Sequence, residues 1–189
     1  MKKLLTLAFM VVAGSTVAQE FPKMDASPMD AAYFPPRAAF RAFAKSDEEK
    51  KANEPQIRVI YSRPQKKDRD VFPGLQKYGE VWRLGANEST EIMFFTDVKV
   101  GDTDIKAGRY TLYCIPQESE WEIHFSTDND GWGQYSFKPE ESGIAKITVP
   151  TQNPETAIEA FSIMFEAVDD GAHMIMGWDD QMVRVPIQL

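Results

Sequence analysis

The stretch VWRLGANEST, residues 81–90, places an aromatic ring, a guanidinium, an amide and a carboxylate within seven positions. Trp82 offers a stacking face, Arg83 offers forked donors, and the Asn87 amide offers both donors and an acceptor. These groups suit a ligand-binding corner. They equally suit a structural corner, in which Asn87 satisfies loop backbone and Arg83 pairs with Glu88 or Glu91, because buried arginines and amides commonly serve the backbone.

Short strand-like runs with turn signals between them make up the chain from residue 56 onward. No helical pattern of about 10–15 residues separates them, which disfavours a parallel α/β fold. The pattern predicts an all-β protein, an antiparallel β-sandwich that is jelly-roll-like, with a short N-terminal helical extension. The predicted strands are 57–63, 90–96, 109–116, 120–126, 144–150, 160–168, 172–178 and 182–187.

The run EWEIHFS (120–126) shows the two-residue period of a half-buried strand most clearly. We expect its apolar residues to face the core, namely Trp121, Ile123 and Phe125. The intervening residues, His124 among them, are expected to face water.

Residues 1–18 have the order of a secretory signal peptide, with two lysines, an apolar run over 4–13, and small residues at Thr16 and Ala18. The apolar run is short for a membrane span. We therefore expect a periplasmic or secreted protein that is cleaved after Ala18 and keeps no transmembrane segment.

Residues 19–55 are predicted to form an N-terminal tether and short helix, before a β-sandwich domain over 56–189. Five prolines break this segment, and we expect the part before Tyr33 to be flexible. Residues 36–53 are rich in helix formers and predict one helix or two short ones, with Ser46 and Glu49 as a capping box. Two apolar side chains of this stretch are expected to pack on the body, namely Phe40 and Phe43.

Charge and cysteine content exclude several classes of protein. The net charge of −8 disfavours nucleic acid as a partner. Cys114 is the only cysteine, so no intramolecular disulfide exists, and its apolar strand predicts a buried, inert thiol. Asp128–Gly131 matches part of a calcium loop but lacks the later oxygen ligands, which favours a turn. No metal site and no cofactor are predicted.

Several blocks of the sequence resemble a bacterial family of secreted proteins known only as a domain of unknown function. The blocks are IRVIYSRPQKKDRD, YGEVWRLGANESTEIMF, KAGRYTLYCIP, WEIHFS, GWGQY and MGWDDQMVRVPI. The resemblance covers residues 56–189 and implies a secreted or periplasmic address and a β-sandwich, but no activity. Where the family has Phe-Gly, this chain has Phe72-Pro73-Gly74.

The residues that match two of these blocks are the candidates for one polar cluster. The ligand-binding candidates are Tyr61, Arg63, Trp82, Arg83, Asn87 and Glu88. The leading interpretation is a ligand-binding or envelope-associated module, with carbohydrate or another envelope component as the partner. One alternative is a hydrolase of envelope or polysaccharide material, with Glu88 and either Glu91 or Asp97 as its carboxylates. Another alternative is a purely structural domain. No catalytic constellation is recognisable, so enzymatic activity stays open.

Overall fold

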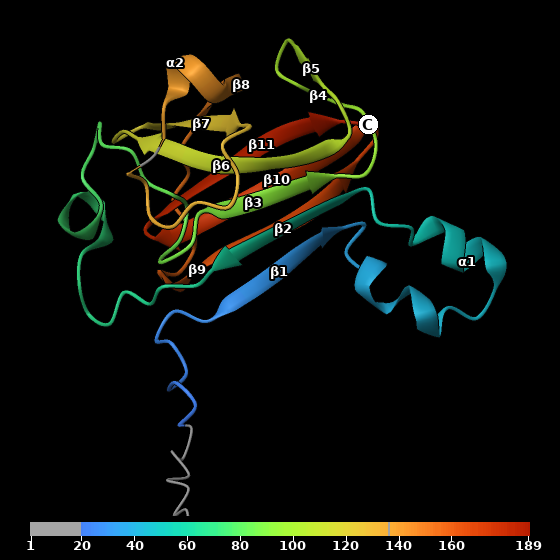
Figure 1. The fold of residues 1–189 in the computed structure, drawn as a ribbon, viewed down its shortest axis with the longest axis horizontal. Coiled ribbons are helices and arrows are strands. Elements are labelled where there is room, and N and C mark those ends of the chain that lie inside the picture. The colour runs from blue at the N-terminus through green and yellow to red at the C-terminus, as the bar shows by residue number, and fades with distance from the viewer. Residues whose placement is uncertain (1–19, 136) are drawn as a thin grey trace, which may run out of the picture.

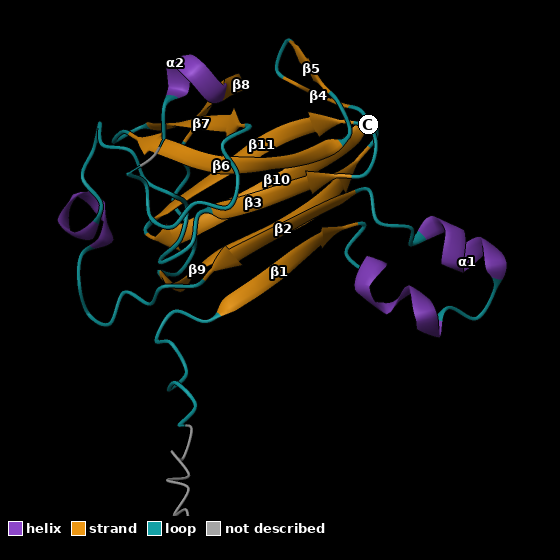
Figure 2. Ribbon diagram, in the orientation of Figure 1, coloured by secondary structure: helices purple, strands orange, loops and turns teal. Residues whose placement is uncertain are grey.

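The computed structural model describes residues 20–135 and 137–189, and it shows two antiparallel sheets packed face to face (Figures 1 and 2). The larger sheet has the order β1-β2-β3-β6-β7-β8 and the smaller has the order β5-β4-β11-β10-β9. The prediction of an all-β sandwich is therefore confirmed. The expected signal peptide lies outside the described residues. Within the described residues, no helix is long and apolar enough to cross a membrane.

Each of the eight predicted runs forms a strand, and three further strands were not predicted. The six-stranded sheet contains β1 (Met29–Phe34), β2 (Ile57–Ser62), β3 (Thr90–Phe94), β6 (Gly108–Pro116), β7 (Glu120–Ser126) and β8 (Gly143–Pro150). The five-stranded sheet contains β4 (Val98–Val100), β5 (Thr103–Ile105), β9 (Ile158–Val168), β10 (Gly171–Asp179) and β11 (Gln181–Gln188). The helical pieces are η1 (Ala38–Phe43), α1 (Asp47–Ala52), η2 (Val71–Leu75) and α2 (Pro139–Ser142).

Strand β7 has the predicted inner face. Trp121, Ile123 and Phe125 are each 0% exposed and belong to the core between the sheets. The prediction for His124 was wrong, because this side chain is only 7% exposed. The ring of Tyr113 stacks on it with centroids 4.6 Å apart, and Phe137 from the β7–β8 loop stacks on Tyr113. The outer face of the sheet thus carries a small covered cluster here.

The prediction of a buried thiol at Cys114, which lies on β6, is confirmed. Cys114 is 0% exposed, and burial raises its pKa well above the ordinary value. A thiol held protonated in this way is a poor nucleophile.

The N-terminal segment differs from the predicted tether. Strand β1 pairs with β2 along its whole length, so the sandwich begins before residue 56. The two short helices are confirmed, and the Ser46 Oγ accepts a hydrogen bond from the Glu49 backbone N–H at 3.1 Å. The expected packing of Phe40 and Phe43 was wrong, because they are 60% and 78% exposed on an arm that projects from the sandwich (Figure 1).

Candidate functional site

The corner formed by residues 81–90 is held at both ends by backbone hydrogen bonds. Trp82 pairs with Cys114 of β6 through two bonds of 2.7 and 2.8 Å. The chain then passes through two left-handed residues, Leu84 at φ 54° and Asn87 at φ 59°. The Thr90 hydroxyl closes the bend by donating to the Leu84 carbonyl at 2.5 Å. The tight bend expected in this stretch is therefore present.

Gly85 lets this corner approach the end of β2 closely. A β-carbon at position 85 would lie 3.1 Å from the carbonyl oxygen of Ser62, which is tighter than ordinary van der Waals contact. The Gly85 carbonyl also accepts a hydrogen bond from the Trp82 indole at 3.2 Å. The corner is thereby placed beside the loop that follows β2.

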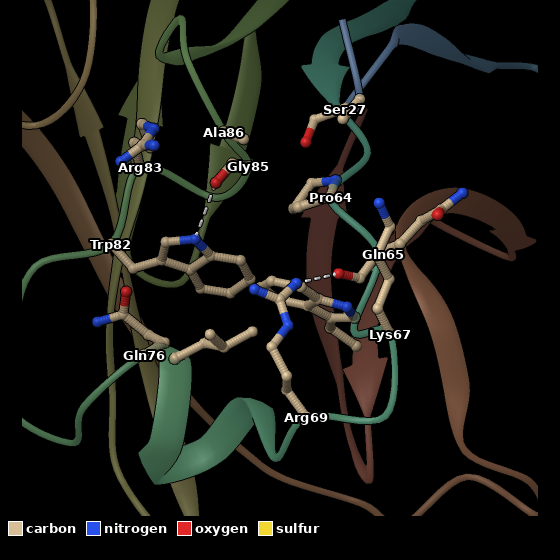
Figure 3. A pocket seen from close by; sticks show the side chains of 13 residues that line it. Ser27, Pro64, Gln65, Lys67, Arg69, Gln76, Trp82, Arg83, Gly85 and Ala86 are labelled. Atoms are coloured by element: carbon tan, nitrogen blue, oxygen red, sulfur yellow. Dashed lines mark hydrogen bonds between the residues drawn. The ribbon is translucent and has the colours of Figure 1, made fainter.

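A pocket of about 440 Å³ lies between the corner and this loop (Figure 3). Figure 3 shows Trp82, Arg83, Gly85 and Ala86 on one side and Ser27, Pro64, Gln65 and Lys67 on the other. The remaining lining residues are Ala26, Arg69, Leu75, Gln76 and Trp178. Because the segment 35–56 joins β1 and β2 at their other ends, the pocket and the projecting arm lie at opposite ends of the sandwich (Figure 1).

Three cationic side chains line the pocket, and no lining residue is acidic. Among the described residues, Lys67, Arg69 and Arg83 form no ion pair. Arg69 donates to two neutral carbonyls instead, those of Lys66 and Gln65, both at 2.7 Å. In the described chain, these three cations thus lack an ion-pair partner, and the nearest carboxylate on this loop, that of Glu159, accepts a hydrogen bond from the Lys67 backbone N–H at 3.1 Å.

The guanidinium of Arg83 is partly buried. Its Nη1 donates to the Gln134 side-chain oxygen at 3.2 Å. Its Nε is buried without a hydrogen-bond partner among the described residues. Burial lowers the pKa of the guanidinium, because desolvation disfavours its charged form.

The loop that carries Lys67 and Arg69 is anchored by its neighbour Lys66. The Lys66 ammonium forms an ion pair with Asp179 at the end of β10. The second Asp179 carboxylate oxygen accepts a hydrogen bond from the Val71 backbone N–H at 3.1 Å. One carboxylate thus fixes both ends of the basic loop.

Two tryptophans form the apolar floor of the pocket. The rings of Trp82 and Trp178 are near-parallel, with centroids 5.7 Å apart and an interplanar angle of 24°. They are 3% and 5% exposed, so they present an edge rather than an open face. Trp82 also contacts three rings of the core, those of Phe72, Trp121 and Phe161. It therefore supports the fold as well as the pocket.

Tyr61 and Arg63 lie outside this pocket and join the two sheets. The Tyr61 hydroxyl accepts a hydrogen bond from the Ile163 N–H of β9 at 3.0 Å. The Arg63 guanidinium donates to the Ser162 hydroxyl at 2.9 Å and pairs with Asp30 at 3.0 Å. Both side chains therefore form hydrogen bonds that hold the fold together.

The expected cluster of Arg63, Arg83, Asn87 and Glu88 is not formed. Within residues 20–135 and 137–189, no hydrogen bond or ion pair joins any two of these side chains, and Arg83 pairs with neither Glu88 nor Glu91. The Asn87 amide makes no hydrogen bond in this described part of the chain. Asparagine suits this position because it tolerates the left-handed backbone better than other residues do. Glu88 is exposed and lines a different hollow.

The structure also brings in residues that the sequence did not single out as a site. Lys67 and Arg69 come from the loop after β2, and Trp178 comes from β10. The signal that could have identified the first two is the basic run KKDR in a chain of net charge −8. Nothing local in the sequence places Trp178 beside Trp82.

The fold and the pocket define an all-β sandwich with a cationic hollow at one end. Over residues 44–187, the chain matches a family described as protein of unknown function (DUF2911). The chain belongs to this family, as its resemblance to a domain of unknown function indicated. Comparisons with curated proteins and with solved structures gave no match.

Proposed function

We propose that this protein is an exported ligand-binding module, and that the pocket beside Trp82 and Arg83 takes a small ligand with an anionic group. The observation that carries the proposal is the set of three cations facing one hollow with no acidic lining residue. In a chain of net charge −8, a hollow lined by three cations and no acidic residue is an electrostatic feature that favours anions.

The side chains of the pocket narrow the class of ligand. Guanidinium groups match carboxylates and phosphates because their donors form a planar fork. The amides of Gln65 and Gln76 and the hydroxyl of Ser27 offer donors and acceptors for hydroxyl groups. This chemistry suits a carbohydrate or another envelope component that carries a carboxylate or phosphate. The composition of residues 1–18 supports a periplasmic or secreted location for such a protein.

The hydrolase alternative has less support from the geometry. Glu91 forms an ion pair with Arg109 at 3.1 Å, and Asp97 forms one with Lys106 at 2.7 Å in a separate hollow. Hydrogen bonding to Lys106 lowers the pKa of Asp97, whereas a general acid needs a raised pKa. The structural alternative explains Tyr61 and Arg63 and the hydrogen bonds of Arg69 and Arg83, but it does not explain why three cations line one hollow that has no acidic lining residue.

Binding of glucose 6-phosphate, glucuronate and neutral glucose tests the proposal by calorimetry. We expect the two anions to bind and glucose to bind at least about tenfold more weakly, because only the anions engage the cations. Arg69→Gln should weaken anion binding by at least about tenfold. Arg41→Gln is the matched control, because Arg41 also donates to a backbone carbonyl but lies in η1 on the projecting arm. Equal affinities for all three sugars, or equal losses in both variants, would contradict the proposal.

A further inference from the structure

The loop between β7 and β8 is fixed against the corner at residues 87–89. Two backbone bonds join them, Ser89 N–H to Gly131 O at 3.0 Å and Gly133 N–H to Asn87 O at 2.7 Å. The Ser89 hydroxyl adds a third bond, to Gly133 O at 2.9 Å. The side chain of Gln134 accepts the fourth from Arg83. The segment GWGQY (131–135) is therefore held in place by the most recognisable block of the family pattern.

Two aromatic rings of this fixed segment face water. Trp132 is 61% exposed and Tyr135 is 85% exposed, whereas the other three tryptophans are at most 5% exposed. Their rings are near-parallel, with centroids 6.3 Å apart and an interplanar angle of 22°. Large exposed aromatic surface lowers solubility without stabilising the fold, so a fixed exposed pair indicates a contact surface.

Gly133 is required beneath the Tyr135 ring. Its φ is 77°, in the left-handed region that favours glycine. A β-carbon at this position would lie 2.7 Å from the Tyr135 ring, which real contacts do not allow. A side chain at position 133 would therefore displace the exposed ring of Tyr135.

A hollow of about 350 Å³ lies beside the bridge between Glu88 and Trp132. It is lined by Glu88, Ser89, Glu91, Thr111, Asp130 and Gly131, together with two apolar side chains, Met29 and Ile60. Arg109 pairs with Asp130 through bonds of 2.7 and 2.8 Å and with Glu91 at 3.1 Å. The Glu88 carboxylate has no hydrogen bond or ion pair within the described residues, so it remains an open acceptor beside the rings.

We propose that Trp132 and Tyr135, together with Glu88, form a second binding site that takes a neutral saccharide. A sugar ring presents an apolar C–H face that packs on an aromatic ring and hydroxyl groups that donate to a carboxylate. The open carboxylate disfavours an anionic ligand, which separates this site from the cationic pocket. The inference does not depend on the proposed anion site.

Fluorescence quenching by acrylamide reports directly on this site, because Trp132 is the one tryptophan in the described chain that water reaches freely. Cellohexaose, chitohexaose and maltohexaose serve as probes. At least one hexasaccharide should protect wild-type Trp132 from acrylamide in a saturable manner. Calorimetry should then show a loss of at least about tenfold for Trp132→Ala and for Tyr135→Ala. Phe43→Ala removes an equally exposed ring on the distant arm and should bind as wild type does.

Gly133→Ala gives a second, independent variant. It leaves both aromatic residues present but displaces the Tyr135 ring, so it should weaken saccharide binding by at least about fivefold. A cooperative urea transition with an unchanged m-value would show that the fold is kept, although the left-handed backbone at position 133 should lower the midpoint. Arg69→Gln should retain saccharide binding in full, so failure of the anion site and failure of this site are distinguishable.

Three results would overturn the inference. One is that none of the three hexasaccharides protects Trp132. Another is that Trp132→Ala and Phe43→Ala bind the saccharide equally well. The third is that Trp132 becomes protected only as protein concentration rises, with a matching dimer in sedimentation, because the rings would then contact a second copy of the chain.

Discussion

Replacing Phe125 with alanine tests the packing of the strand on which the larger sheet depends. The side chain is 0% exposed near the end of β7, between β6 and β8, and its ring packs against Phe94 with centroids 6.1 Å apart. Loss of the buried ring costs about 2–3 kcal/mol in transfer free energy. The cavity left between strands that are hydrogen-bonded on both sides cannot collapse freely, which raises the expected loss to about 3–5 kcal/mol.

Urea denaturation of Phe125→Ala and Phe43→Ala measures this difference with one chemical change at two sites. Phe43 is 78% exposed, so its replacement should change the free energy of unfolding by less than about 0.5 kcal/mol. Equal losses in the two variants, or a loss below about 1 kcal/mol for Phe125→Ala, would refute the assignment of the inner face of β7.

Three further predictions concern other parts of the chain. Burial lowers the pKa of His124 below its ordinary 6.5, so the folded state binds fewer protons than the unfolded state, and stability should fall as pH drops below about 6.5. His124→Phe should flatten that dependence by up to about 1.4 kcal/mol per pH unit in urea melts, and a slope identical to wild type would show that His124 does not cause it. Asn87→Ala should cost about 1 kcal/mol because of the left-handed backbone, whereas Asn87→Gly should be nearly neutral; equal losses would implicate the amide itself. N-terminal sequencing of the exported protein should begin at Gln19, and a cytoplasmic product that retains Met1 would count against export.

Eight strands of the sandwich could be predicted from the sequence because each shows a local pattern of apolar residues between turn signals. The two-residue period of 120–126 shows its inner face directly, since alternate side chains point to opposite faces. His124 departs from this alternating pattern of exposure. On the outer face of the sheet, Tyr113 of the neighbouring strand stacks on His124, and Phe137 of the β7–β8 loop stacks on Tyr113. Whether another segment covers a strand depends on tertiary packing, which the residue period of that strand does not predict.

The strands that the sequence missed depend on partners rather than on pattern. Strand β1 lies between two prolines and is defined by its pairing with β2, about thirty residues away in the chain. Strands β4 and β5 have three residues each, too few to show a period. Likewise, helix formers predicted η1 and α1 but did not show that Phe40 and Phe43 face away from the body.

Only part of the candidate site could be predicted from the sequence. Trp82 and Arg83 belong to one local block and were predicted together, and both line the pocket. Lys67 and Trp178 reach the same pocket from β2 and β10, and their convergence depends on how the two sheets pack. Tyr61 and Arg63 were candidates because their block resembles the expected family, yet in the structure they join the end of β2 to β9.

The indole N–H signals of the four tryptophans give the most direct measurement of where an anion binds. Titration of the ¹⁵N-labelled protein with glucose 6-phosphate should shift the signals of Trp82 and Trp178 in a saturable manner, because both line the cationic pocket. The signal of Trp132 should move much less, since this ring lies outside that pocket. Saturable shifts of Trp132 with no shift of Trp82 or Trp178 would contradict the assignment of the anion site.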